Sequence, residues 1–161
     1  MNLREKGGRH QKKKKLNKTM SWDEYCQAIQ QLGFSKVTIV NRETYVAIAQ
    51  SPKEAIATTY MDGSTTINEN EELSSDWKSS KRQLFRFYGM KFKIVKRDES
   101  QGKWLIGERP SDFIVVRAFQ AVWFIASARK KSDQSKTGFT SAQEAFDTIN
   151  KELWSGLEGY I

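Results

Sequence analysis

The chain of 161 residues has one histidine, one cysteine and two prolines. His10 lies in a strongly basic N-terminal stretch, away from any apolar segment, so we expect no buried histidine to act as a general base or metal ligand. Cys26 cannot form an internal disulfide, and one cysteine excludes a cysteine-rich zinc site. No signal-peptide pattern precedes it, so we expect an intracellular protein in a reducing compartment, with the cytoplasm favoured.

Several enzyme signatures are also absent. The chain has no G-x-x-x-x-G-K-[ST] phosphate-binding loop, no G-x-G-x-x-G motif and no G-x-S-x-G motif. One weak nuclease-like arrangement exists, in which Asp62 and Asp76 hold Mg²⁺ while Lys78 polarises a water molecule. Both acids lie in a predicted turn or loop, where Asp is favoured for backbone reasons. We therefore predict a non-enzymatic protein without a cofactor or a metal.

The longest apolar stretch is too short and too interrupted to span a membrane, which takes about 20 apolar residues. It runs from Phe113 to Ala128 and reads FIVVRAFQAVWFIASA. β-Branched and aromatic side chains dominate it, which favours a strand over a helix. We predict one long, bent strand or two strands meeting near Gln120, with the rest of the chain organised around them and no membrane contact.

Two segments combine a helix-capping pattern with apolar residues at helical spacing. Ser21 and Glu24 have the form of a capping box, in which each side chain satisfies the other residue's backbone N–H, and the apolar positions continue to Leu32. Ser141 opens a similar segment that ends near Leu153. A third helix is predicted from about residue 75, because the apolar residues between 77 and 88 share a helical face.

Alternation of polar and apolar residues predicts strands between these helices, at 36–40, 44–50, 90–97 and 103–106. Asp62-Gly63 is a hairpin signal, although the segment 53–60 before it also has a helical alternative. Strands that are grouped between helices indicate an α+β fold, with an antiparallel sheet and about three helices packed on one face. We predict a basic flexible arm at 1–19 and a single α+β domain at 20–161. This domain has two possible halves, 20–68 and 75–161, joined by an acidic, Ser-rich loop.

Positive charge is concentrated in two parts of the chain. The net charge is +8, and residues 1–20 alone contribute +7. Within the remainder, residues 62–76 contain five acids and no base, whereas residues 77–97 contain eight bases and no acid. These bases alternate with aromatic residues, a composition that can hold phosphates and stack on unpaired bases. The alternative is that the aromatic side chains point inward and the bases are solvated or paired with the acids.

The function that we predict is non-enzymatic nucleic-acid binding, with RNA or single-stranded DNA favoured over a duplex. The candidate binding residues are Arg4, Lys6, Arg9, Lys12, Lys13, Lys14, Lys15, Lys18, Lys78, Lys81, Arg82, Arg86, Lys91, Lys93, Arg129, Lys130 and Lys131. The alternative function is a protein-interaction module, a subunit or inhibitor that docks on a larger assembly through its segregated charges.

The motif Gly138-Phe139-Thr140-Ser141-Ala142-Gln143-Glu144-Ala145 lies within a longer segment, from Ala121 through Leu153. That longer segment distantly resembles the end of an AP2-type DNA-binding module, in which a strand is followed by a loop, a turn and a helix. The resemblance covers about a fifth of the chain, and its motif is mostly the capping pattern shared by many helices. We transfer no functional residue on this basis.

Overall fold

The computed structural model describes residues 20–53, 59–73, 82–132 and 136–157. The arm predicted at 1–19 and part of the predicted acidic loop lie outside these residues. The helices are α1 (Trp22–Gln31), α2 (Glu69–Leu73), α3 (Ala142–Glu152) and the 3₁₀ turn η2 (Trp154–Gly156). The strands are β1 (Lys36–Asn41), β2 (Ala47–Ser51), β3 (Thr59–Asp62), β4 (Thr65–Asn68), β5 (Leu84–Phe87), β6 (Met90–Arg97), β7 (Trp104–Arg109), β8 (Asp112–Ala118) and β9 (Val122–Arg129).

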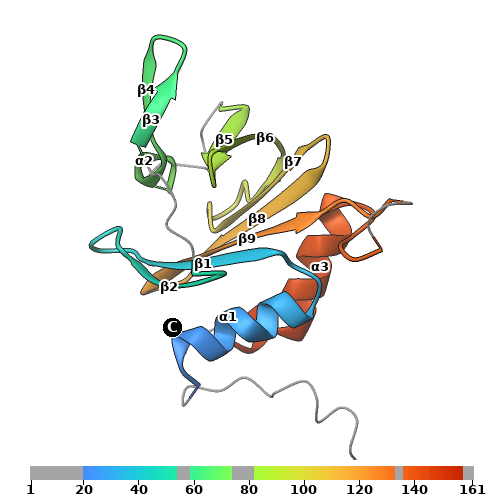
Figure 1. Ribbon diagram of the computed structural model, residues 1–161. Helices are drawn as coiled ribbons and strands as arrows, with labels where there is room; N and C mark the ends of the chain where they lie inside the picture. Colours follow the sequence, from blue (N-terminus) through green and yellow to red (C-terminus); the bar gives the residue numbers. More distant parts are fainter. Residues whose placement is uncertain (1–19, 54–58, 74–81, 133–135, 158–161) are drawn as a thin grey trace, which may run out of the picture.

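Seven strands form one antiparallel sheet in the order β2-β1-β9-β8-β7-β6-β5 (Figure 1). The apolar block forms the β8–β9 hairpin inside this sheet, so the two-strand alternative, with a break near Gln120, is confirmed. Since β1 pairs with β9, strands from residues 36–51 and from residues 84–129 belong to the same sheet. The predicted hairpin at Asp62-Gly63 is also confirmed, as the separate two-stranded sheet β3–β4.

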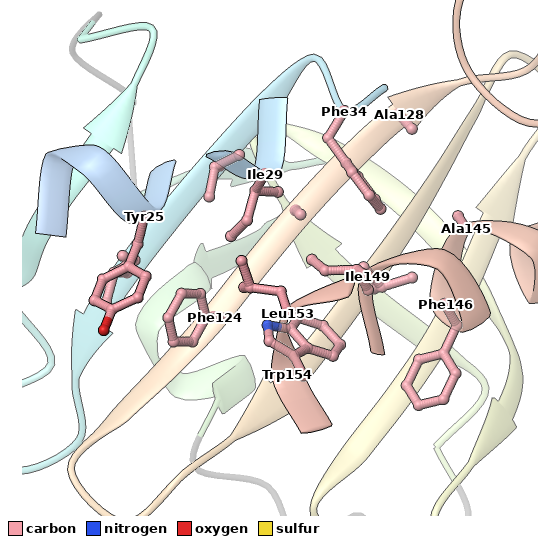
Figure 2. Close-up of a cluster of buried hydrophobic side chains, with 14 of the residues drawn as sticks. Tyr25, Ile29, Phe34, Phe124, Ala128, Ala145, Phe146, Ile149, Leu153 and Trp154 are labelled. Carbon is pink, nitrogen blue, oxygen red and sulfur yellow. The ribbon is translucent and has the colours of Figure 1, made fainter. Parts of the chain in front are cut away.

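Helices α1 and α3 cover one face of the large sheet (Figure 1). The predicted capping box of α1 is present, since Ser21 and Glu24 exchange hydrogen bonds of 3.1 and 2.9 Å. Helix α3 is capped by Ser141, whose Oγ accepts the N–H of Glu144 at 3.1 Å. The apolar stripe of α1 packs on β1 and β2, and that of α3 packs on β8 and β7, within one core that also includes side chains of β9. Figure 2 shows Trp154 among the side chains of this core. The α+β class with an antiparallel sheet and three helices is confirmed.

A second core fills the opposite face, on the inside of the curl of the sheet (Figure 1). Its members come from one end of the strand order and from its middle, because Phe85 of β5 and Phe92 of β6 pack with Ile114 of β8 and Ile125 of β9. Leu73 of α2 belongs to this core, so α2 lies apart from α1 and α3. The curl therefore closes the sheet over its own aromatic side chains.

The predicted helix from about residue 75 to residue 88 is wrong in its described part. Residues 84–87 form the strand β5, which pairs with β6 in the register Leu84↔Lys93 and Phe85↔Phe92. Tyr88 and Gly89 form the turn, and both have a positive φ. The apolar spacing of this segment fits either structure, and pairing with β6 decides in favour of the strand.

The turn between β6 and β7 depends on one buried carboxylate. Asp98 accepts hydrogen bonds from the N–H groups of Ser100, Gln101 and Lys103 at 3.0–3.1 Å. Burial acts to raise the pKa of Asp98, but the hydrogen bonds, led by that from Lys103, hold it below its ordinary value. The ionised carboxylate is thus the form that the fold stabilises.

We expect Asp98→Ala to lower the free energy of unfolding by about 2–4 kcal/mol, since it leaves several turn donors without an acceptor. Urea denaturation at neutral pH measures this loss, and exposed Asp147→Ala is the matched control, expected to change stability by about 0.5 kcal/mol or less. Because the folded pKa is lowered, the contribution is present above the unfolded pKa of about 3.9 and is lost as the pH falls further. Equal losses in the two variants would contradict this role.

Within the described residues, no helix has the length and apolar character needed to cross a membrane.

Candidate protein-docking surface

The aromatic side chains that we expected to stack on bases are buried. Phe85 and Phe92 are fully buried, and Phe87 and Tyr88 nearly so, all within the second core. Tyr88 also donates a hydrogen bond to the carbonyl of Ile125 at 3.3 Å. None of these rings presents a face to solvent, so they cannot form a stacking platform for unpaired bases.

Three bases of the same segment, Arg82, Arg86 and Lys91, are paired with nearby acids. Arg82 forms an ion pair with Glu72, and the same carboxylate accepts the backbone N–H of Arg86 at 2.8 Å. Asp62 pairs with Arg86 at 3.3 Å and with Lys91 at 3.2 Å. Lys78 and Lys81 lie outside the described residues. Within the described residues, Glu72 and Asp62 of the acidic segment therefore offset part of the positive charge at β5 and β6.

The bases after β9 do not extend this region into one positive surface. Arg129 is the register partner of Asp112, and Lys93 is that of Glu108. These two acids, on β8 and β7, lie between the two groups of bases. Lys130 lies over the ring of Phe113, with its Nζ 5.7 Å from the centroid, and Lys131 is exposed. The arm bases, Arg4 to Lys18, lie outside the described residues.

The nuclease-like arrangement finds no support in the described part of the chain. Its carboxylate Asp62 is engaged by Arg86 and Lys91, while Asp76 and Lys78 lie outside the described ranges. Among the residues that the structure describes, no group of three or more His, Cys, Asp or Glu side chains could hold a metal ion. That the protein has no catalytic activity stays a prediction.

A different surface is formed by the outward side chains of β5 and β6, which we call the β5–β6 surface. Alternation along the strands places Phe85, Phe87, Phe92 and Ile94 in the second core, so their neighbours point the other way. The members of the β5–β6 surface are Leu84, Arg86, Lys91, Lys93 and Val95. This is the sheet face that α3 covers at β7 and β8, but β5 and β6 extend beyond the helix.

Two apolar side chains remain exposed on this surface beside its cations. Leu84 is 38% exposed and Val95 is 43% exposed, and the register places Lys93 directly opposite Leu84. A β-bulge at Val95 shifts the pairing with β7, and bulges commonly re-aim side chains at functional edges. Apolar anchors with charged neighbours are typical of surfaces that dock another protein.

A second exposed apolar stretch lies at the opposite edge of the sheet, where Val46 and Ile48 flank the start of β2. It has no cations among its own residues from Thr44 to Ser51. The β5–β6 surface is the stronger candidate because it combines apolar groups with an ordered set of charges.

Sequence reasoning found part of this surface. The alternation that predicted a strand at 90–97 agrees with the structure, in which Lys91, Lys93 and Val95 lie on one face of β6. Leu84 was missed because its segment was predicted as a helix. The alternating pattern of Leu84 to Phe87, with Phe85 and Phe87 inward, is the signal that could have found it.

No protein-family model matches the chain, and no curated protein matches it in sequence. Solved structures do resemble it. Schizosaccharomyces pombe profilin has a TM-score of 0.57 at 13% identity, covering 87% of this chain and 100% of its own. Acanthamoeba castellanii profilin IB has a TM-score of 0.56 at 11% identity, covering 86% and 98%. Profilin II of the same organism has a TM-score of 0.54 at 12% identity, covering 84% and 99%.

At these identities the likeness shows a profilin-like fold over most of the chain. This likeness contradicts the prediction of a nucleic-acid-binding protein, because the similar solved structures named above are profilins. Buried aromatic rings and paired bases explain in physical terms why the sequence was misleading.

Proposed function

We propose that the chain is a non-enzymatic protein-interaction module that docks on a protein partner through the β5–β6 surface. The observation that carries the proposal is the pair of exposed apolar side chains, Leu84 and Val95, set among Lys91, Lys93 and Arg86 on an uncovered part of the sheet. The profilin-like fold supports it, because profilins are actin-binding proteins. In its finer form, the proposal is that the partner is actin-like.

The chemistry of the surface defines the complementary patch on the partner. Leu84 and Val95 provide small apolar contacts that become buried on docking. The three cations select a partner surface with carboxylates at its rim, and complementary charge raises the association rate and fixes the orientation. The buried, unpaired thiol of Cys26 supports a reducing intracellular compartment for this interaction.

Reversing one charge on this surface tests the proposal. Monomeric actin is the probe, and its affinity for the full chain is measured by isothermal titration calorimetry at low and physiological salt. We expect Lys93→Glu to weaken binding by about tenfold or more at low salt, because it places a like charge against the partner's carboxylates. The difference should shrink as salt increases.

Lys53→Glu is the matched control. It makes the same change in net charge on an exposed residue that follows β2, at the other edge of the sheet. We expect it to leave the affinity within about twofold, since distant exposed charges are screened. Equal weakening by both variants would count against the β5–β6 surface, and no binding by the unaltered chain would remove the actin-like partner.

A further inference from the structure

The β3–β4 hairpin stands apart from the large sheet (Figure 1). Polar side chains of β3 contact β5, β6 and α2. Alternation along β3 turns Tyr60 and Asp62 toward the body of the protein, and Met61 between them is 60% exposed. The Tyr60 hydroxyl donates to Glu69 of α2 at 2.7 Å, which anchors the root of the hairpin. Asp62 directly precedes the turn of the hairpin, so its ion pairs lie near the tip.

The carboxylate of Asp62 lies on two cations that belong to the β5–β6 surface. Its Oδ2 is 3.3 Å from Nη2 of Arg86 and 3.2 Å from Nζ of Lys91. Arg86 and Lys91 are register partners on neighbouring strands, so their side chains emerge side by side. The hairpin therefore places an acid of this chain at the position where an acidic group of a partner would bind.

The ion pairs made by Asp62 leave hydrogen-bonding capacity of Arg86 and Lys91 unused. One oxygen serves both cations, at distances longer than the 2.7–2.9 Å typical of charge-assisted hydrogen bonds. The Nε of Arg86 is buried and has no hydrogen-bond partner within the described residues. A carboxylate aligned with the edge of the guanidinium group would engage Nη2 and Nε together, a geometry that arginine favours.

We propose that Arg86 and Lys91 form a carboxylate-binding site, that Asp62 occupies it in the free protein, and that an acidic side chain of the partner takes the site by displacing the tip of the hairpin. This inference rests on the proposed function, which supplies the partner. The hairpin is then an intramolecular competitor, and the apparent affinity for the partner is reduced by the fraction of molecules in which Asp62 holds the site.

The surroundings allow the tip to move while the root stays in place. Asp62 is 39% exposed in its side chain, and ion pairs of that exposure contribute little stability. Glu69, which holds Tyr60, is fully buried and also accepts the N–H of Gly89 at 2.9 Å. The pKa of Asp62 is held below its ordinary value by Lys91 and Arg86, so the competing carboxylate is ionised at neutral pH.

Asp62→Asn tests the proposal, because asparagine has nearly the same shape without the charge. The probes are monomeric actin and a capped hexaglutamate peptide, each titrated into the full chain. We expect Asp62→Asn to bind each probe about threefold to tenfold more tightly than the unaltered chain. In NMR titrations with the peptide, the Arg86 Nε–H signal should shift, as expected for a new hydrogen bond at that atom.

Asp23→Asn is the matched control, since it removes the exposed Lys53–Asp23 ion pair on α1 and should leave both affinities unchanged. Weaker or unchanged binding of both probes by Asp62→Asn would overturn the competition. If actin binds neither the unaltered chain nor Asp62→Asn, the proposal of an actin-like partner is wrong. The titration with the peptide still tests the carboxylate-binding site independently. Amide hydrogen exchange without any probe adds a separate readout: faster exchange at 59–62 and 65–68 in Asp62→Asn supports the displacement, and unchanged exchange contradicts it.

Discussion

Gly138→Ala is expected to destabilise the folded chain by about 3 kcal/mol or more. A Cβ at residue 138 would lie 2.0 Å from the carbonyl oxygen of Arg129, far inside van der Waals contact, and the φ of +104° is one that side chains rarely adopt. Neither backbone segment can easily withdraw. The N–H of Phe139 donates to Arg129 at 3.1 Å, and the N–H of Lys131 donates to Phe139 at 2.8 Å.

Chemical denaturation followed by circular dichroism measures this loss. Gly63→Ala is the control, because Gly63 also has a positive φ, of +64°, but a Cβ there would meet nothing within 4 Å. The control isolates backbone strain, which we expect to cost about 1 kcal/mol. Similar losses in the two variants would mean that the approach of residue 138 to Arg129 is not a constraint on the fold.

Trp154→Ala is expected to lower the free energy of unfolding by about 3–5 kcal/mol, because a large aromatic side chain is removed from a filled core. Trp154 is fully buried where η2 follows α3. Its ring lies 6.0 Å from that of Phe146, 6.3 Å from Phe124 and 6.4 Å from Phe119, measured between centroids. Figure 2 shows it between α3 and the sheet, so its loss would leave a cavity where helix and sheet meet.

Trp154→Phe separates packing from hydrogen bonding. The indole Nε1 of Trp154 is buried without a hydrogen-bond partner in the described residues. Phenylalanine therefore gives up ring volume but no hydrogen bond, and we expect a loss of only about 1–2 kcal/mol. Thermal and urea denaturation of both variants give the comparison. A loss from Trp154→Phe that equals the loss from Trp154→Ala would indicate that Nε1 does have a partner.

Much of the fold could be predicted because its signals are local. The capping residues Ser21 and Ser141 satisfy N–H groups within three residues of themselves, so the starts of α1 and α3 need no distant contact. The turn at Asp62-Gly63 and the density of β-branched residues between 113 and 128 act over a similarly short range. These elements were predicted in type and approximate position.

The segment from Leu84 to Tyr88 could not be assigned in this way. Its apolar residues suit one face of a helix and also the alternation of a strand, and a short apolar run does not distinguish the two. Pairing with β6 and burial of Phe85 against Ile114 decide the structure. The burial of Phe85 against Ile114 depends on the curl of the sheet, which brings β5 over β8.

The function was misjudged for a related reason. Composition shows bases interleaved with aromatic residues at 77–97, but not which side chains face solvent. Curling of the sheet buries Phe85 and Phe92, and the hairpin brings Asp62 to Arg86 and Lys91 across more than twenty residues of sequence. Sequence patterns alone show that basic and aromatic side chains alternate along amphipathic elements. A protein-docking surface and a nucleic-acid-binding site can both have this pattern.

The sequence by itself determined the α+β class, the antiparallel grouping of the strands, and the places where α1 and α3 begin. These depend on capping, turn residues and side-chain periodicity, which act within a few residues. Only the tertiary structure decided that β5 is a strand, that its aromatic rings are buried, and that Leu84, Lys93 and Val95 remain exposed. The physical reason is that burial and ion pairing at these positions come from partners distant in the chain, which are brought together only when the sheet curls.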